Sequence, residues 1–475
     1  MKIHNVRAGF ATNSSSSHSI VMVPRGQHVH TDEYDRYNYG WEQFTLADPE
    51  SKAAYFIAQM YQAMNSCQLS EHEIYHTIRT LLGVDVTDLP TETGVDHQST
   101  WYGLDQTIKN YPELVKQMFV FVQRDDVVIL GGNDNSDQQE PPANSWEDPR
   151  VHIFGQLGAG KLKQDGANWI MFNDRSGTKM RFTLDPDAAP YEKSTVPELV
   201  DLKITNWCSY GCSFCYQSST KQGQHAELKH VKKVLKALGE MEVFEVAIGG
   251  GEPTHYPYLI QVLEEARAHG IVPNFTTFGV DWLKNEQLVK KVQECVGAIG
   301  VSVHSVSDLN KVSKINDVIN TTQNVFTKRH VKVTAQHVVG SQDIGELAQI
   351  LETCWDNGVD LLLLGYKQVG FGKTQECHDM TGLDVLLKLR QDRKLHWRAR
   401  MSMLGVDTAF VQQFQPLLDE LKIPNVLVTS EEGKFSMYAD CVTMTQGPSS
   451  YMPDFMEPID TTDILGSIQR AYAKW

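Results

Sequence analysis

The sequence predicts an α/β fold for residues 196–394, because strand-like and helix-like stretches alternate there without interruption. Apolar, β-branched runs predict six strands, at 199–205, 243–248, 272–277, 298–303, 331–338 and 360–365. Helical periodicity between and after them predicts helices at 226–239, 257–269, 284–294, 310–327, 343–356 and 381–391. Six βα units in a row predict a parallel sheet wrapped by helices, with its chemistry at the carboxyl ends of the strands.

The preceding residues, 1–195, predict an α+β accessory domain. A strand is expected at Ser19–Val23, and helices over Ser51–Asn65 and Ser70–Leu82, the second opening with the capping-box pair Ser70 and Glu73. Apolar runs predict two strands, Met118–Val122 and Val127–Leu130, and turn residues predict hairpins within 151–185.

Two further stretches are less regular. Gly131–Ser145 is rich in Gly, Asn, Asp, Gln and Pro, which predicts a long loop. Residues 395–475 predict an irregular C-terminal extension that caps the α/β core. Within it we expect strands at 401–405 and 434–439 and a helix at 462–474.

The 475-residue chain is acidic, with a formal net charge of −16. An acidic surface repels phosphate backbones, which disfavours nucleic-acid binding and favours a small substrate or a peptide with cationic groups. The sequence shows neither a signal-peptide core nor a run near the ~20 apolar residues of a membrane helix, so we expect a cytoplasmic protein. Its eight cysteines are too sparse for a disulfide scaffold.

Three of these cysteines crowd together directly after the first expected strand. Cys208, Cys212 and Cys215 have the spacing C-x3-C-x2-C. Three thiolates on one loop can bind three irons of a [4Fe-4S] cubane, which leaves the fourth iron open to a small molecule. The alternative is a zinc site completed by His225, although structural zinc sites more often pair two C-x2-C knuckles and the sequence has no second one.

The cysteine segment resembles the signature of the radical S-adenosylmethionine (SAM) superfamily, both in spacing and in its place after the first strand. The resemblance implies a partial (β/α)6 barrel in which the three cysteines hold a [4Fe-4S] cluster. It also implies that Phe214, just before the third cysteine, packs near the SAM adenine.

A glycine-rich turn follows the second expected strand. Gly250, Gly251, Glu252 and Pro253 resemble the superfamily's Gly-Gly-Glu-Pro motif, which holds the methionine amino group of SAM. Glycines let the backbone approach a ligand closely, and carbonyls and a carboxylate suit an ammonium group. An ordinary turn after a strand is the alternative for this motif.

Polar residues at the ends of later strands are weaker candidates. Ser302 and His304 end the fourth strand, where the superfamily often binds the SAM ribose or carboxylate. The ends of the fifth and sixth strands add His337, Gly340, Tyr366 and Lys367. Each could face the cavity of the barrel, and each could equally be a satisfied polar group at a strand end.

The resemblance implies a SAM-dependent radical reaction. Reductive cleavage of SAM would give a 5'-deoxyadenosyl radical, which abstracts a hydrogen atom from a substrate C–H bond, with an electron donor such as flavodoxin or ferredoxin. We expect a peptide or protein side chain as substrate over a nucleoside or small metabolite, because the chain is acidic and its tail resembles that of peptide-modifying members. The competing class is a non-catalytic, zinc-stabilised interaction module.

The tail that carries this resemblance includes Phe435–Cys441, but it departs from the auxiliary-cluster pattern because it has a single cysteine. Cys441 is either a hydrogen-atom donor to a substrate radical or a buried structural thiol. Cys354, Cys377 and Cys441 could also converge on an auxiliary cluster.

Three other motifs favour plain structural interpretations. His72–His76 matches H-E-x-x-H, the pattern of zinc proteases, but it lies on a polar helix and predicts a solvated face. Gly155–Lys161 nearly matches a phosphate-binding loop, but Leu162 stands where that loop needs Ser or Thr, which favours a β-turn. Thr12–Ser19 predicts a polar loop, with anion binding or serine modification as alternatives.

Overall fold

The computed structural model divides the chain into two compact units. The first comprises residues 1–173 and 177–190, and the second comprises residues 174–176 and 191–475. The structure describes residues 2–7, 19–22, 31, 38–39, 44–84, 86, 94–95, 101, 104–124, 127–131, 161–174, 177–184, 189, 191–320, 331–393, 404–421 and 431–475. No helix in these ranges has the length and apolar character needed to cross a membrane.

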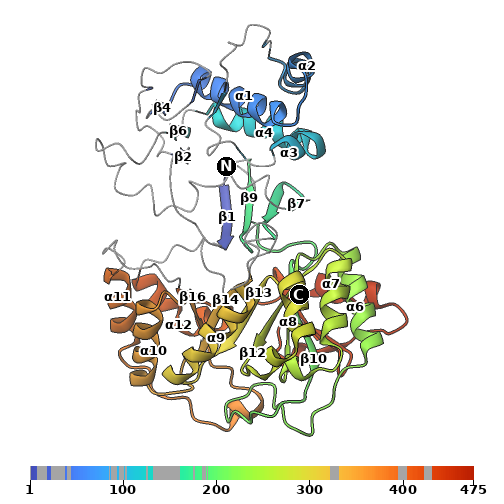
Figure 1. The fold of residues 1–475 in the computed structure, drawn as a ribbon, viewed down its shortest axis with the longest axis vertical. Coiled ribbons are helices and arrows are strands. Elements are labelled where there is room, and N and C mark those ends of the chain that lie inside the picture. The colour runs from blue at the N-terminus through green and yellow to red at the C-terminus, as the bar shows by residue number, and fades with distance from the viewer. Residues whose placement is uncertain are drawn as a thin grey trace. The chain divides into compact units, whose positions relative to one another are not determined.

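Within its described residues, the first unit contains three small sheets and four helices. Figure 1 shows the helices grouped together. An antiparallel sheet has the order β1-β9-β8-β7, from strands Lys2–Arg7, Lys179–Thr183, Asn168–Phe172 and Lys161–Asp165. A second antiparallel sheet has the order β2-β6-β4, from Ser19–Met22, Val127–Gly131 and Phe44–Leu46, and a third pairs β3 (Asn38–Tyr39) with β5 (Gly94–Val95). The helices are α1 (Pro49–Asn65), α2 (Glu71–Leu82), α3 (Leu104–Asn110) and α4 (Pro112–Val122).

Sequence signals at the helix starts explain α2 and α4, and one sequence prediction in this unit is wrong. The capping box predicted at the start of α2 is present, since Ser70 and Glu73 bond reciprocally. The strand predicted at Met118–Val122 is wrong, because these residues form the last part of α4. Pro112 starts that helix, and Leu114, Met118 and Phe121 recur at helical spacing on its buried face.

In the part of the second unit that the structure describes, the main element is a ten-stranded, largely parallel sheet. Its order is β16-β15-β14-β13-β12-β11-β10-β17-β18-β19, and every neighbouring pair from β16 to β17 is parallel. The strands in chain order are β10 (Leu199–Thr205), β11 (Glu245–Gly250), β12 (Val272–Thr277), β13 (Ala298–Ser302), β14 (Lys332–Val338), β15 (Leu361–Leu364), β16 (Leu404–Val406), β17 (Ser436–Asp440), β18 (Thr445–Gly447) and β19 (Glu457–Pro458).

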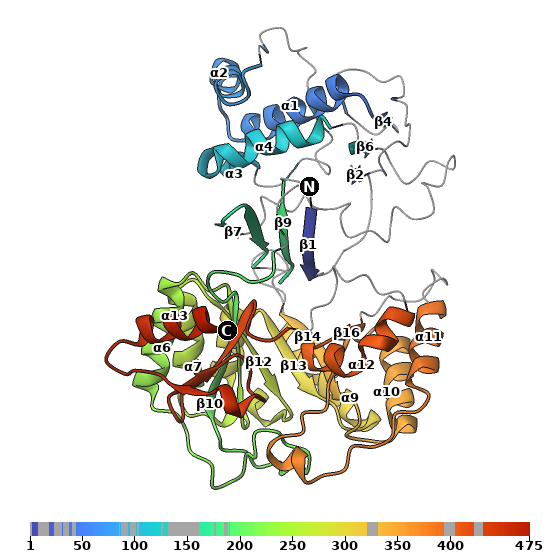
Figure 2. The ribbon, with the colours of Figure 1, turned by 180° about the vertical axis from the view of Figure 1, so that it is seen from behind.

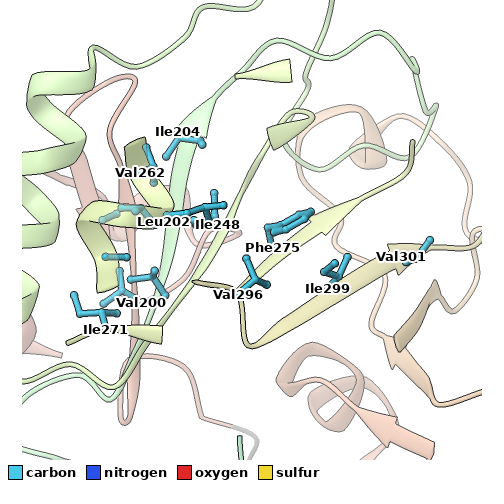
Figure 3. Packing of buried hydrophobic residues seen from close by; sticks show 14 of the residues in the cluster. Val200, Leu202, Ile204, Ile248, Val262, Ile271, Phe275, Val296, Ile299 and Val301 are labelled. Carbon is cyan, nitrogen blue, oxygen red and sulfur yellow. The ribbon is translucent and has the colours of Figure 1, made fainter. Parts of the chain in front are cut away.

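Helices flank this sheet and enclose a continuous apolar core (Figures 1 and 2). They are α6 (Leu228–Glu240), α7 (Leu259–Ala268), α8 (Glu286–Cys295), α9 (Leu309–Asn320), α10 (Ile344–Asp356), α11 (Leu383–Arg393), α12 (Thr408–Glu420) and α13 (Ile464–Lys474). Figure 3 shows part of the core, where alternate residues of β10 pack with residues of β11 to β13 and of the flanking helices. Because side chains alternate along a strand, the other residues of β10 face the opposite, inner side of the sheet.

The α/β fold class and the six βα units are confirmed. The structure adds strands at both edges of the expected six-stranded core. Residues 395–475, which the sequence predicts as an irregular capping extension, supply these strands. β16 pairs with β15 at one edge, and β17 inserts beside β10 at the other. These pairings give hydrogen-bond partners to backbone N–H and C=O groups of β10 and β15 that would otherwise be unpaired.

Candidate functional site

The cysteine loop starts where β10 ends, and a short ladder holds its base. Isolated bridges pair Thr205 with His225 and Trp207 with Thr220. Thr205 Oγ1 lies 2.8 Å from His225 Nδ1 and accepts a hydrogen bond of 2.9 Å from Trp207 N. Cys208 N donates to Thr220 O at 2.9 Å. These contacts fix the root of the loop at the carboxyl end of the first strand of the core.

The three thiols lie near one another and are partly buried. Burial raises the pKa of Cys212 to about 11, and the Cys215 and Cys208 thiols add to that rise. Burial also raises the pKa of Cys208, against the backbone amides of Tyr210 and Gly211, which donate toward its sulfur. Among the residues the structure describes, no three or more Cys, His, Asp or Glu side chains are arranged to share one metal ion, which a cubane does not require. Three coupled thiols on one loop are the donor set of a cubane, in which each thiolate binds its own iron.

The glycine turn after β11 packs directly against the root of this loop. Gly251 N donates to Thr205 O at 2.7 Å, and Glu252 N donates to Trp207 O at 2.9 Å. A Cβ at Gly250 would collide with Thr205 O, and one at Gly251 would collide with Trp207 O. Gly250 also has a φ of +113°. Both glycines are therefore required by the close approach of two backbones, which joins the turn to the cysteine loop.

The carboxylate of Glu252 is turned into the protein and only 2% exposed. Its Oε1 accepts hydrogen bonds from Thr254 Oγ1 at 2.7 Å, Thr277 Oγ1 at 2.9 Å and Thr254 N at 3.1 Å, while Oε2 accepts one from Phe278 N at 3.0 Å. The side chain thus ties the end of β11 to the end of β12, a role that the sequence did not predict. Pro253, also buried, opens the short 3-10 helix Pro253–His255.

Aromatic rings line the neighbourhood of the cysteine loop. The Phe214 ring meets the His304 ring edge-on at 5.0 Å, and His304 stacks on Phe278 at 4.5 Å. Lys311 Nζ lies 3.3 Å from the centroid of Phe278. Burial lowers the pKa of His304 to about 4, against the attraction of Asp308, so its imidazole is neutral near pH 7.

The other strand-end candidates divide between the two faces of the sheet. Ser302 is partly exposed and lies on the inner face, since its neighbours Ile299 and Val301 belong to the helix-side core. His337 is fully buried, with Nδ1 2.8 Å from Val303 O, and shares the core side with Ala335.

The remaining candidates follow β14 and β15. Tyr366 is buried, and its hydroxyl donates to Gln375 O. Gly340 has a φ of +87° and packs against Cys377. The structure gives both residues local structural roles.

The scattered cysteines do not come together in the described part of the chain. Cys441 directly follows β17 and is 1% exposed within the helix-side core, which fits the buried structural thiol better than a hydrogen-atom donor. Cys354 is buried on α10, and Cys377 is exposed in a loop. The described residues therefore give no support to an auxiliary cluster formed by these three cysteines.

Three sequence motifs favour a plain structural role, and that interpretation stands where the structure describes them. His72 and His76 are exposed on α2, and Glu73 is engaged in the capping box. The expected loop at 132–145, the phosphate-loop-like residues 155–160 and residues 12–18 lie outside the described residues.

Sequence reasoning missed several polar atoms around the cysteine loop. Asn206 Oδ1, Ser219 Oγ and His255 Nδ1 are buried without a hydrogen-bond partner among the described residues. His255 also packs edge-on against Trp207 at 4.8 Å. Only the position of Asn206, directly after the first strand, gave a sequence signal, since the other two are brought in by the fold.

Residues 202–354 match the family model described as the radical SAM superfamily. This match places residues 202–354 in the radical SAM superfamily. The matched segment begins in β10 and ends in α10, so it contains the cysteine loop, the glycine turn and the strand-end residues Ser302 and His304. Radical SAM proteins use a [4Fe-4S] cluster and SAM, and the three thiols described above fit that cluster.

Curated relatives match part of the chain. A "Probable GTP 3',8-cyclase" of Sulfurisphaera tokodaii is 27% identical over 216 residues, which cover 42% of this chain and 68% of that protein. The mycofactocin maturase MftC of Mycobacterium tuberculosis is 34% identical over 85 residues, which cover 18% of this chain. The chain spans about a fifth of that maturase's length, 22%.

Two matches to solved structures are of low identity and low TM-score. SuiB of Streptococcus suis, bound to the precursor peptide SuiA, is 14% identical with a TM-score of 0.46, and the match covers 65% of this chain and 88% of that one. Native anSMEcpe with bound AdoMet and the Cp18Cys peptide is 14% identical with a TM-score of 0.41, covering 59% of this chain and 81% of that one.

Proposed function

We propose that this protein is a radical SAM enzyme that modifies its substrate by hydrogen-atom abstraction from a C–H bond. The observation that carries the proposal is the three-cysteine loop at the end of β10, bonded through its backbone to the glycine turn at the end of β11. When bound, the cluster and SAM supply a reductive cleavage of SAM that gives methionine and a 5'-deoxyadenosyl radical. Cys208, Cys212 and Cys215 hold the cluster.

The chain's own residues position SAM beside the cysteine loop. The backbone carbonyls at Gly250 and Gly251 accept the methionine ammonium, and both glycines let this turn pack directly against the root of the cysteine loop. Glu252 keeps this turn in place through its four hydrogen bonds. Phe214 and His304 bind the adenosine by ring contacts, and a neutral His304 avoids placing a charge against the cationic sulfonium.

A peptide or protein side chain is the favoured substrate, with reduction by a flavodoxin- or ferredoxin-like donor. The acidic charge of the chain suits a cationic peptide. One relative, a PqqA peptide cyclase of Bradyrhizobium diazoefficiens, is named for a peptide substrate, and another is named as the mycofactocin maturase MftC. The GTP cyclase relatives keep a nucleotide or small metabolite as the second candidate.

The direct test is SAM cleavage by the purified, anaerobically reconstituted protein. Dithionite and SAM should yield 5'-deoxyadenosine from the natural protein and none from Cys208→Ala. Cys67→Ala is the matched control, because Cys67 is an exposed thiol of the first unit and should leave the yield unchanged. Equal yields from natural protein and Cys208→Ala, or no product from a protein that carries a complete cluster, would refute the proposal.

A further inference from the structure

The three cysteines of the loop are held to the rest of the fold in different ways. Cys208 N donates to Thr220 O at 2.9 Å, which ties the start of the loop to the ladder at its base. Cys215 O accepts a hydrogen bond of 3.0 Å from Phe371 N, in the 3-10 turn that follows β15. Cys212 O accepts one of 3.2 Å from Cys215 N, inside the loop itself. Over the described residues, no hydrogen bond joins Cys212 to another segment of the chain.

Two aromatic side chains flank Cys212, Tyr210 two residues before it and Phe214 two residues after it. The Tyr210 ring meets the Phe278 ring edge-on, with 4.9 Å between the centroids and 77° between the planes. The Phe214 ring meets the His304 ring edge-on, at 5.0 Å and 76°. Phe278 and His304 stack on each other at 4.5 Å and 16°. These four residues, which we name the aromatic clamp, connect one side of Cys212 to the other through ring contacts.

The stacked pair at the centre of the aromatic clamp is anchored to the ends of β12 and β13. Phe278 N donates to Glu252 Oε2 at 3.0 Å, and His304 N donates to Asp308 Oδ2 at 2.9 Å. Both carboxylates are buried. Lys311 forms an ion pair of 2.8 Å with Asp308 and places its Nζ 3.3 Å from the Phe278 centroid. The pair is therefore a fixed support for rings that reach it from the cysteine loop.

Gly279, the residue after Phe278, makes room for the Tyr210 ring. A Cβ at Gly279 would lie 1.9 Å from Tyr210 Oη and 3.0 Å from Tyr210 Cζ. The glycine backbone is itself fixed, because its N donates to Thr277 Oγ1 at 3.2 Å and its O accepts a hydrogen bond of 3.1 Å from Trp282 Nε1. The missing side chain at this position is thus what admits the Tyr210 ring beside Phe278.

Burial in the apolar core does not explain the aromatic clamp. All four of its residues are partly exposed, and none of them belongs to the helix-side core. Their edge-on and stacked arrangements are instead the ones in which aromatic rings attract each other. Because the backbone of Cys212 is not tied to another described segment, these ring contacts are what limits its movement. Groups that orient the ligands of a metal centre in this way tune how well the centre is held.

We propose that the aromatic clamp positions Cys212, so that its thiol is held at a fixed place relative to Cys208 and Cys215 for binding the cluster. Tyr210 and Phe278 act through Cys212 and are therefore positioning residues. This inference rests on the proposed function, since it concerns the ligands of the cluster. It goes beyond the cysteine motif, because the support for the middle ligand comes from the ends of two other strands.

The experiment measures the rate of iron release from the anaerobically reconstituted full-length protein to the chelator bathophenanthroline disulfonate. The electron paramagnetic resonance spectrum of the dithionite-reduced cluster is recorded on the same samples. Phe278→Leu removes two ring contacts and should raise the release rate about tenfold. It should also shift the g values of the reduced cluster. Phe455→Leu, at an exposed phenylalanine, is the matched control and should change neither readout.

A second variant displaces one arm of the aromatic clamp without removing a ring. Gly279→Ala should also raise the release rate, because its Cβ would push the Tyr210 ring away from Phe278. Tyr210→Phe is the conservative variant, since it keeps the ring and loses a hydroxyl that has no hydrogen-bond partner among the described residues. Combined with Gly279→Ala, it removes the atom in closest collision and should restore slow release. Fast release in the double variant, or slow release in Gly279→Ala alone, would overturn the inference.

A third variant separates the aromatic clamp from a general loss of stability. Lys203→Met breaks a buried ion pair of 3.1 Å with Asp440 and should lower the urea midpoint while iron release stays slow. Release from Lys203→Met as fast as from Phe278→Leu would overturn the inference. Should Phe278→Leu not fold, Gly279→Ala with and without Tyr210→Phe decides alone.

The same samples distinguish failure of the inference from failure of the proposed function. If the natural protein holds a cluster and forms 5'-deoxyadenosine while the clamp variants release iron at its rate, the inference alone fails. If the natural protein takes up no iron and sulfide, the proposed function fails and the inference falls with it.

Discussion

The buried carboxylate of Glu252 gives the sharpest test of how the SAM-binding turn is held. In Glu252→Gln, the amide oxygen can keep the three bonds now made by Oε1, but the amide nitrogen then faces Phe278 N, which is itself a donor. One hydrogen bond to a charged group is lost and two donors are opposed, which should cost about 2–3 kcal/mol. Glu252→Ala removes all four bonds and should cost about 4 kcal/mol or more.

The assay is anaerobic urea unfolding of the second unit, followed by SAM binding. With an m-value on the order of 3 kcal/mol/M, Glu252→Gln should lower the unfolding midpoint by roughly 0.8 M. Glu376→Gln, at an exposed position, is the matched control. A midpoint unchanged in Glu252→Gln together with a large loss of SAM affinity would refute the reasoning, because it would mean that the carboxylate contacts SAM instead of holding the turn.

Three more predictions follow from single sites. Gly251→Ala should lose most of its bound iron and unfold at lower urea, because its Cβ would collide with Trp207 O; normal iron content would contradict the close approach of the two backbones. Stability should fall as the pH drops from about 6.5 to about 4, since His304 takes up a proton in the unfolded chain before it does so in the folded one, and unfolding of His304→Gln should show a shallower slope over that window. Lys203→Met should cost about 3 kcal/mol in urea unfolding, because it leaves Asp440 buried without its ion-pair partner; a loss below about 1 kcal/mol would show that the pair is dispensable.

The parts of the site that the sequence predicted are those made by neighbours in the chain. Cys208, Cys212 and Cys215 share one loop, and Gly250 and Gly251 share one turn, so spacing alone indicates their chemistry. The βα alternation likewise follows from periodicity within each segment. The prediction of a strand at Met118–Val122 was wrong because an apolar run of strand length can also form the end of a helix. In the structure this run is the last part of α4, which begins at Pro112.

What the sequence could not predict depends on contacts between distant segments. Lys367 was recognisable as a strand-end candidate, but its neighbours Asp201, Asp407 and Glu432 are separated from it by 40 to 166 residues and meet it only in the fold. Glu252 is similar, because its partner Thr277 ends the next strand and its partner Phe278 directly follows that strand. The place of β17 beside β10 also has no local signal, since it is set by which sheet edge is open.

The central claim is that three thiolates hold a cluster and leave one iron without a protein ligand. Iron and sulfide analysis of the anaerobically purified protein, with electron paramagnetic resonance of the reduced sample before and after addition of SAM, tests it most directly. We predict about four irons and four sulfides per chain, and a reduced-cluster signal that changes when SAM is added. One zinc per chain without sulfide, or a cluster signal that SAM leaves unchanged, would contradict the claim.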